Sequence, residues 1–246
     1  MTTPDATTIF AERYARWEAL HHREGPAASY PYAWRLPELA RPLGQATWQT
    51  AQTALAQDLA ALGRFTEARA ALCPGCDPAL ATRLYWLTGG ETAPAAFFDP
   101  DEAADFAYLT DTPHPFPASL PDTPWNAVLA YWHACRCGQT PAEAAAHHAL
   151  ATLRRLQPPA AAEAEAIFAE ARYCIAPGWS VVWLDHALVL IDAYGQHHLK
   201  ARLLGVKALA LRAAGELGES ARFLKLARQL AERQGAAAYL RRFDAD

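Results

Sequence analysis

Apolar residues return at helical spacing in every long segment of this 246-residue chain, whereas no segment alternates apolar and polar residues for long enough to be a confident strand. The first helical segment extends from about Asp5 to Glu24, and Asp5 is a residue type that caps helix N-termini. One face of this segment carries Phe10, Tyr14, Trp17 and His21. The sequence therefore predicts an all-α fold.

Short breaks at glycine and proline divide the helical segments into pairs. The first pair is broken at Gly63, and later pairs are broken at 138–141, 177–178 and 215–218. Each pair spans roughly 30–40 residues, which is the period of helical-repeat proteins. Because one pair cannot bury its own apolar face, we expect consecutive antiparallel hairpins to stack into a curved α-solenoid of roughly ten helices.

A segment with four prolines and two glycines, residues 25–44, interrupts this pattern after the first helix. We therefore expect residues 1–44 to form an N-terminal helix and a connector, and residues 45–246 to form the repeat region, as one continuous domain. In an extended connector, Tyr30, Tyr32 and Trp34 would face the same side. Such a row is suited to covering the apolar face of the first hairpin or to docking a peptide.

The turn of the first pair, Gly63-Arg64-Phe65-Thr66-Glu67-Ala68, resembles the Gly-x-aromatic-x-Glu-Ala signature of tetratricopeptide repeats. Gly63 can take a positive φ in the tight turn, Phe65 can fill the corner between hairpins, and Ala68 lets the second helix approach the first. The resemblance implies a TPR-like, non-catalytic scaffold whose concave groove binds a peptide or a partner protein.

The last pair, which ends in ARQLAERQGAAAYLRRF (residues 227–243), is similar to the terminal helical repeats of large ATP-dependent bacterial transcription activators. Those repeats usually sense an effector or a partner protein, so this similarity implies an alternative function, an effector-sensing regulatory module. The chain has no phosphate-binding G-x-x-x-x-G-K-[ST] motif, and the other functions of such activators are therefore not implied.

The distribution of charge indicates a candidate binding site on the last pair. The net charge is −4, yet residues 199–246 hold ten Lys and Arg against five Asp and Glu. Lys200 and Lys207 recur at i, i+7 on the first helix of the pair, with Arg202 beside them. Our hypothesis is that these three form the basic edge of a groove that binds an acidic peptide or a carboxylate terminus. The alternative is a solvated helix face.

Two acidic residues form a second candidate site on the most apolar predicted helix, VVWLDHALVLIDAYG. Asp185 and Asp192 share one face at i, i+7, and buried carboxylates are costly unless they are partnered. Arg172 or Arg202 from neighbouring helices could serve as the partner. The pair is interpreted as a structural ion pair or as a polar anchor in a ligand groove.

Cysteine and histidine placement suggests a third class of function, a metal or redox protein. Cys73 and Cys76 have C-x-x-C spacing, and His133 and Cys137 share a helical face at i, i+4. These four could hold a structural zinc if the fold brought the clusters together, and the first pair alone could form a disulfide. We favour incidental thiols, and we therefore expect no metal and no cofactor.

Several other functions lack support in the sequence. No catalytic constellation of nucleophile and base is recognisable, so we expect no enzymatic activity. Adjacent histidines at 21–22, 147–148 and 197–198 diverge on a helix, and we interpret them as polar-face or helix-end residues. No strongly basic module indicates nucleic acid, no apolar run approaches the roughly 20 residues of a membrane span, and no secretory signal begins the chain. Five cysteines do not indicate a disulfide framework, so we expect a cytoplasmic protein.

Overall fold

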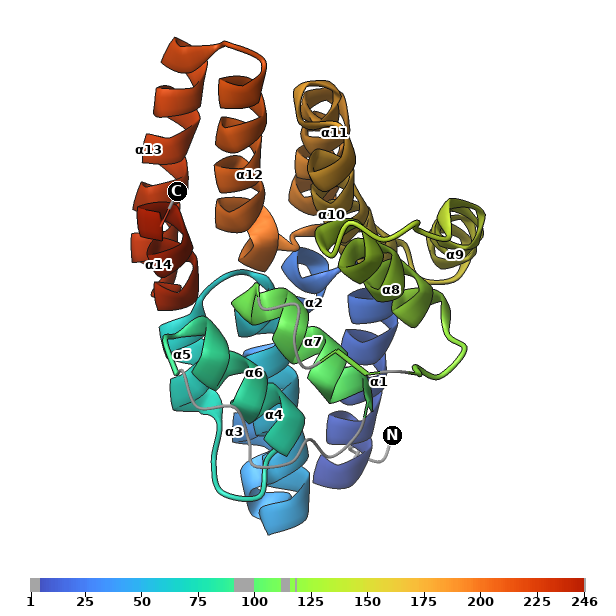
Figure 1. The fold of residues 1–246 in the computed structure, drawn as a ribbon. Coiled ribbons are helices and arrows are strands. Elements are labelled where there is room, and N and C mark those ends of the chain that lie inside the picture. Colours follow the sequence, from blue (N-terminus) through green and yellow to red (C-terminus); the bar gives the residue numbers. More distant parts are fainter. Residues whose placement is uncertain (1–4, 91–99, 112–115, 118, 246) are drawn as a thin grey trace.

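The computed structural model describes residues 5–90, 100–111, 116–117 and 119–245, and every regular element in this part of the chain is a helix (Figure 1). The prediction of an all-α fold is confirmed. The elements are α1 (Ala6–Glu24), α2 (Pro26–Ala33), α3 (Leu36–Ala40), η1 (Arg41–Leu43), α4 (Gln45–Ala61), α5 (Phe65–Ala71), α6 (Pro78–Leu87), α7 (Pro100–Thr110), α8 (Pro124–Arg136), α9 (Glu143–Leu156), α10 (Pro158–Ile175), η2 (Pro177–Trp179), α11 (Ser180–Tyr194), η3 (His197–Leu199), α12 (Lys200–Ala213), α13 (Leu217–Gln234) and α14 (Ala237–Ala245).

The first helix begins and ends where the sequence predicts. Asp5 is its N-cap, and the Asp5 carboxylate accepts a hydrogen bond from the backbone N–H of Thr8 at 2.7 Å. The helix ends at Gly25, whose φ of 90° is a conformation that side chains rarely allow. Trp17 and Leu20 on its inner face are buried.

The expectation of an extended connector after this helix is wrong, because the helices α2, α3 and η1 occupy most of residues 26–43. Pro26 and Pro37 lie in the first turns of α2 and α3, where the missing N–H of proline is not needed. Tyr30 and Tyr32 both lie on α2. Since residues two apart on a helix point to different sides, the predicted aromatic row does not form.

The turn that suggested a helical repeat has the expected local structure. Gly63 has a φ of 75°, and both Phe65 and Ala68 are completely buried. A Cβ added at Gly63 would lie 2.4 Å from the side-chain amide of Gln234 at the end of α13. This glycine therefore serves two purposes, a tight turn and a close approach of a helix distant in sequence.

Helices pack in consecutive pairs through the second half of the molecule (Figure 1). The pairs are α8 with α9, α10 with α11, and α12 with α13, and α10 also contacts both α8 and α12. The turn between α12 and α13 contains Gly215 at a φ of 86°, as the predicted break requires. A further break at Gly235 separates α14 from α13, whereas the sequence predicts that residues 227–243 all belong to the last pair.

Contacts between distant segments join the N-terminal helices to the C-terminal half. α1 packs against α10, and α6 packs against α14. One cluster of buried side chains runs from Trp17 in α1 to Phe243 in α14, across the boundary predicted at residue 44. Among the described helices, none is both long and apolar enough to cross a membrane.

Candidate functional site

The lysines predicted to edge a groove are already paired with the predicted acidic residues of the neighbouring helix. Lys200 Nζ donates to both carboxylate oxygens of Asp192, at 2.6 and 2.7 Å. Lys207 Nζ lies 2.5 Å from Asp185 Oδ1 and 3.9 Å from the centre of the Phe223 ring. The two candidate sites are therefore one structure, a pair of ion pairs between α11 and α12 that we call the α11–α12 ladder.

Carboxylates are the more exposed members of the α11–α12 ladder. The side chains of Asp185 and Asp192 are 52% and 47% exposed, against 11% for Lys207 and 32% for Lys200. Neither aspartate is buried, and neither pairs with an arginine as the sequence suggested. An approaching acidic peptide would meet negative charge first, so the structure gives the predicted preference for an acidic partner no physical support.

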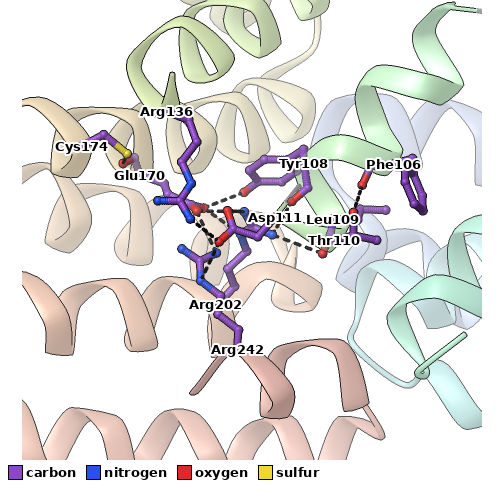
Figure 2. A network of polar contacts seen from close by, with 10 residues as sticks. All are labelled: Phe106, Tyr108, Leu109, Thr110, Asp111, Arg136, Glu170, Cys174, Arg202 and Arg242. Atoms are coloured by element: carbon purple, nitrogen blue, oxygen red, sulfur yellow. Dashed lines mark hydrogen bonds and ion pairs between the residues drawn. The ribbon is translucent and has the colours of Figure 1, made fainter. Parts of the chain in front are cut away.

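Arg202, the third predicted basic residue, lies in the interior and reaches no surface groove. It is 1% exposed, and its Nε and Nη2 atoms donate to the two carboxylate oxygens of Glu170 at 2.7 and 2.8 Å. Its guanidinium also stacks over the Tyr108 ring, 4.0 Å from the ring centre. Figure 2 shows this guanidinium enclosed by side chains from α7, α10 and α14.

More charged side chains extend this buried network (Figure 2). Arg242 Nη1 donates to Glu170 at 2.9 Å, and Arg136 Nη2 donates to Asp111 at 2.8 Å. The hydroxyl of Tyr108 donates to Glu170 at 3.3 Å. These contacts connect α7, α8, α10, α12 and α14, so we call the set the Glu170 network and assign it a structural role.

Electrostatics keep the central carboxylate of the Glu170 network charged. Burial alone would raise the pKa of Glu170, but the nearby charges of Arg202 and Arg242 outweigh burial and lower the pKa to about 2. A buried charge that lacked these partners would be strongly unfavourable. Arg202 therefore stabilises the packing of α12 against α10 and is not accessible to a binding partner.

Cysteines at the end of α5 form one close pair. The Sγ atoms of Cys73 and Cys76 are 2.7 Å apart, and both are free thiols in this structure. Burial, with the hydrogen bond to Cys76, raises the pKa of Cys73 to about 11. A thiol with a raised pKa is a weaker nucleophile than an ordinary thiol. The redox function that the C-x-x-C spacing suggests stays a prediction.

The four predicted metal ligands do not meet in this structure. His133 Nε2 and Cys137 Sγ lie 3.4 Å apart on α8, as their i, i+4 spacing predicts, while Cys73 and Cys76 pack beside α4. Among the described residues, no group of three or more His, Cys, Asp or Glu side chains has the arrangement of a metal site. The two clusters remain separate pairs.

An exposed row that begins at Trp179 in η2 and continues along α11 is the feature that best fits a binding surface. Trp179, Val182 and Val189 are 83%, 73% and 66% exposed, and His186 and Ala193 lie exposed on the same side. We call these five residues the α11 outer row. Several large apolar side chains exposed along one side of a helix are the kind of surface that a partner can cover.

The opposite face of α11 carries the residues that hold it to the protein. Leu184, Ala187 and Ile191 are almost completely buried, and α11 packs on α10 and α12. The helix thus carries apolar residues on two faces, and among the residues that the structure describes only the inner face is packed against other helices. The sequence contained this signal in the even spread of apolar residues around the helix, a pattern typical of a fully buried helix. The sequence-based prediction for this helix names the two aspartates and does not include the α11 outer row.

Comparison of the chain with protein-family models, curated proteins and solved structures finds no match.

Proposed function

We propose that this chain is a non-catalytic binding protein that docks a helix of a partner protein on the α11 outer row. The observation that carries the proposal is the exposure of Val182 and Val189 on one face of α11 and of Trp179 in η2 directly before it. Burying these side chains against a partner would remove apolar surface from water at roughly 25 cal/mol per Å². Large apolar and aromatic side chains are also the residues that dominate binding energy at interfaces.

The spacing of the outer row favours an α-helix as the docked element. Its members lie at 179, 182, 186, 189 and 193, which alternates steps of three and four residues. This alternation is the heptad seam along which two helices pack knobs into holes. The partner segment is therefore an amphipathic helix with apolar residues at the same spacing.

The charged residues beside the α11 outer row predict which charges should flank the apolar face of the partner helix. The exposed carboxylates of Asp185 and Asp192 lie along the side of α11 that faces α12. A partner helix with Lys or Arg next to its apolar seam would gain favourable electrostatics there, and one with Asp or Glu would be repelled. We therefore propose a basic amphipathic helix in place of the acidic peptide that the sequence suggested.

We further propose that α8 to α13 form a short stack of TPR-like hairpins that presents α11 to its partner. Three consecutive helix pairs, with α10 in contact with both α8 and α12, support this arrangement. The contacts of α1 with α10 and of α6 with α14 fold the remaining helices back on the stack. In this architecture the binding surface belongs to the outer side of one hairpin.

The test introduces charged residues into the α11 outer row and measures whether the partner protein still binds. The double variant V182E/V189E changes two exposed residues, and L156E/L226E is the matched control on exposed leucines of α9 and α13. A photo-crosslinking amino acid at residue 186 would report which segment of a captured protein lies on the row. We expect one protein to crosslink through a basic amphipathic helix. This crosslink should be lost in V182E/V189E and retained in L156E/L226E.

Equal capture by the two double variants would contradict the proposal, as would a crosslink to a segment that is not helical or not basic. Light scattering of the purified chain separates a further possibility. A wild-type dimer that becomes a monomer in V182E/V189E would show that a second copy of this chain covers the row, and the proposed hetero-partner would then be wrong.

A further inference from the structure

A cavity of about 410 Å³ lies away from the α11 outer row, among α1, α4, α6, α7, α10 and the residues around η3. Its size falls within the range of roughly 300–1,000 Å³ that is usual for small-molecule sites. Much of its wall is apolar, with Leu80, Leu84 and Leu87 from α6 and Ala60 and Ala61 from α4. Such a wall suits the hydrocarbon part of a small ligand.

A histidine held by a buried carboxylate lines this cavity. His21 Nδ1 lies 2.6 Å from Asp58 Oδ1, and Asp58 is completely buried. The same carboxylate accepts hydrogen bonds from Trp17 Nε1 at 3.0 Å and from Ser29 Oγ at 2.8 Å. Because Asp58 accepts, Nδ1 of a neutral His21 carries the proton and Nε2 keeps its lone pair. The ring therefore offers an acceptor for a ligand that carries a hydrogen-bond donor.

A second histidine–carboxylate pair lines the same cavity. His198 Nε2 lies 2.9 Å from Glu163 Oε1, and Arg83 Nη2 donates to that oxygen at 2.7 Å. His198 is 5% exposed and lies in η3, directly before α12, so of the two predicted positions it has the helix-end one. Burial would raise the pKa of Glu163, but His198 and Arg83 outweigh burial and lower the pKa to about 2. Glu163 is therefore charged at neutral pH.

Negative charge prevails among the residues that line the cavity. Three carboxylates, those of Asp77, Asp105 and Glu163, line it together with a single guanidinium, that of Arg83. Asp58 adds another carboxylate directly behind His21. Apart from the histidines, the residues of the lining and its support carry more carboxylates than guanidinium groups. A cation inside the cavity would offset this excess, whereas an anion would increase it.

We propose that the cavity binds a small organic amine whose ammonium group faces the carboxylates and His21 and whose hydrocarbon part lies on the α6 leucines. The amine supplies N–H donors that match the acceptors, positive charge that balances the carboxylates, and an apolar body that matches the wall. This inference does not depend on the proposed partner-binding function, because the cavity and the outer row share no residue.

Three four-carbon probes test the chemical class, 1,4-diaminobutane, 1,4-butanediol and succinate. They share a length and differ in charge, so their relative binding reports the charge preference of the cavity. Titration calorimetry gives the affinities, and the side-chain amide signals of Gln57 and Gln196, which line the cavity, give the location by NMR. We expect the diamine to bind on the order of tenfold more tightly than the diol, with no binding of succinate.

Matched variants then connect binding to the named residues. H21Q removes the ring that Asp58 orients, whereas H22Q changes the adjacent exposed histidine, and circular dichroism checks that both are folded. A61F fills the cavity without changing its charge and keeps the test valid if H21Q unfolds. We expect diamine binding to fall by about tenfold or more in H21Q and A61F and to persist in H22Q. Equal binding of succinate and diamine, absence of diamine binding, or wild-type affinity in A61F would overturn the proposal.

Discussion

The Glu170 network and the α11–α12 ladder use the same kinds of charged residues on the same helix, α12, yet they differ in almost every physical respect. In the network, Arg202 and Glu170 are 1% and 2% exposed in their side chains, and the arginine grips both carboxylate oxygens. In the ladder, Lys200 and Asp192 are 32% and 47% exposed. Arg202 and Lys200 are only two positions apart in the sequence.

The difference teaches that helical position, more than residue type, sets the role of a charge in this protein. Residues two apart on a helix point to different sides, so Arg202 enters the interior while Lys200 stays at the edge. A buried charge requires its partners, because removing one leaves an uncompensated charge out of water. An exposed pair competes with water and salt, and it contributes little to stability.

Replacing Arg202 by Met should have the largest effect. The variant leaves Glu170 buried without its two-oxygen partner, and we expect the free energy of unfolding to fall by about 3–5 kcal/mol. For a chain of this size, the melting temperature should drop by roughly 10 °C. K200M is the matched control on the same helix and should melt within a few degrees of wild type.

The double variant R202M/E170M tests whether the loss comes from the stranded charge. Since Arg202 and Glu170 are then both uncharged and Arg242 keeps Asp111 as a partner, stability should recover toward wild type. Equal melting of R202M and K200M would show that the buried network carries no more energy than the surface ladder, and the comparison between the two regions would fail.

Acid should remove the stabilisation that the two buried carboxylates, Glu170 and Glu163, give to the fold. The pKa is about 2 for both Glu170 and Glu163 in the folded chain, below the ordinary value of 4.5. A depressed folded pKa means that the stabilisation is fully present above the unfolded value and is lost as pH falls from about 4.5 toward 2. Each carboxyl accounts for about 3 kcal/mol over that interval.

Urea unfolding at several pH values between 6 and 3 measures this loss, with E170Q as the comparison. The variant cannot release a proton at this position, so its stability should fall less steeply with acid than that of wild type. Parallel slopes for the two proteins would mean that Glu170 does not titrate with a depressed pKa in the fold.

Helices and turns could be predicted from the sequence where the determinants are local. The cap at Asp5, the break at Gly63 and the apolar spacing of α1 and α4 all depend on residues a few positions apart. The helical conformation of 25–44 was missed because proline reads as a breaker, although Pro26 and Pro37 occupy the first turns that tolerate it.

Burial and the cavity could not be predicted, because they depend on which distant helices meet. The partners of Arg202 come from α7 and α10, and the cavity collects His21, Arg83, Glu163 and His198 from widely separated positions. The spacing of residues within one helix does not predict these contacts between distant helices. The pairing of Lys200 with Asp192 could have been predicted, because the two residues have opposite charges and lie on helices that follow one another in the sequence. The sequence-based predictions instead place them in two different candidate sites.

The smallest effect is expected in the α11–α12 ladder, where a double-mutant cycle of K200M and D192N isolates one pair. Both side chains are partly exposed, so the coupling energy should be about 0.2–1 kcal/mol. It should shrink further in 1 M salt, where the screening length is about 3 Å. A coupling energy of about 3 kcal/mol that persisted in salt would show that the α11–α12 ladder stabilises the fold as a buried ion pair does, and that Asp192 has a structural role. A small, salt-sensitive coupling would leave its carboxylate available to the basic flank of a helix docked on the α11 outer row.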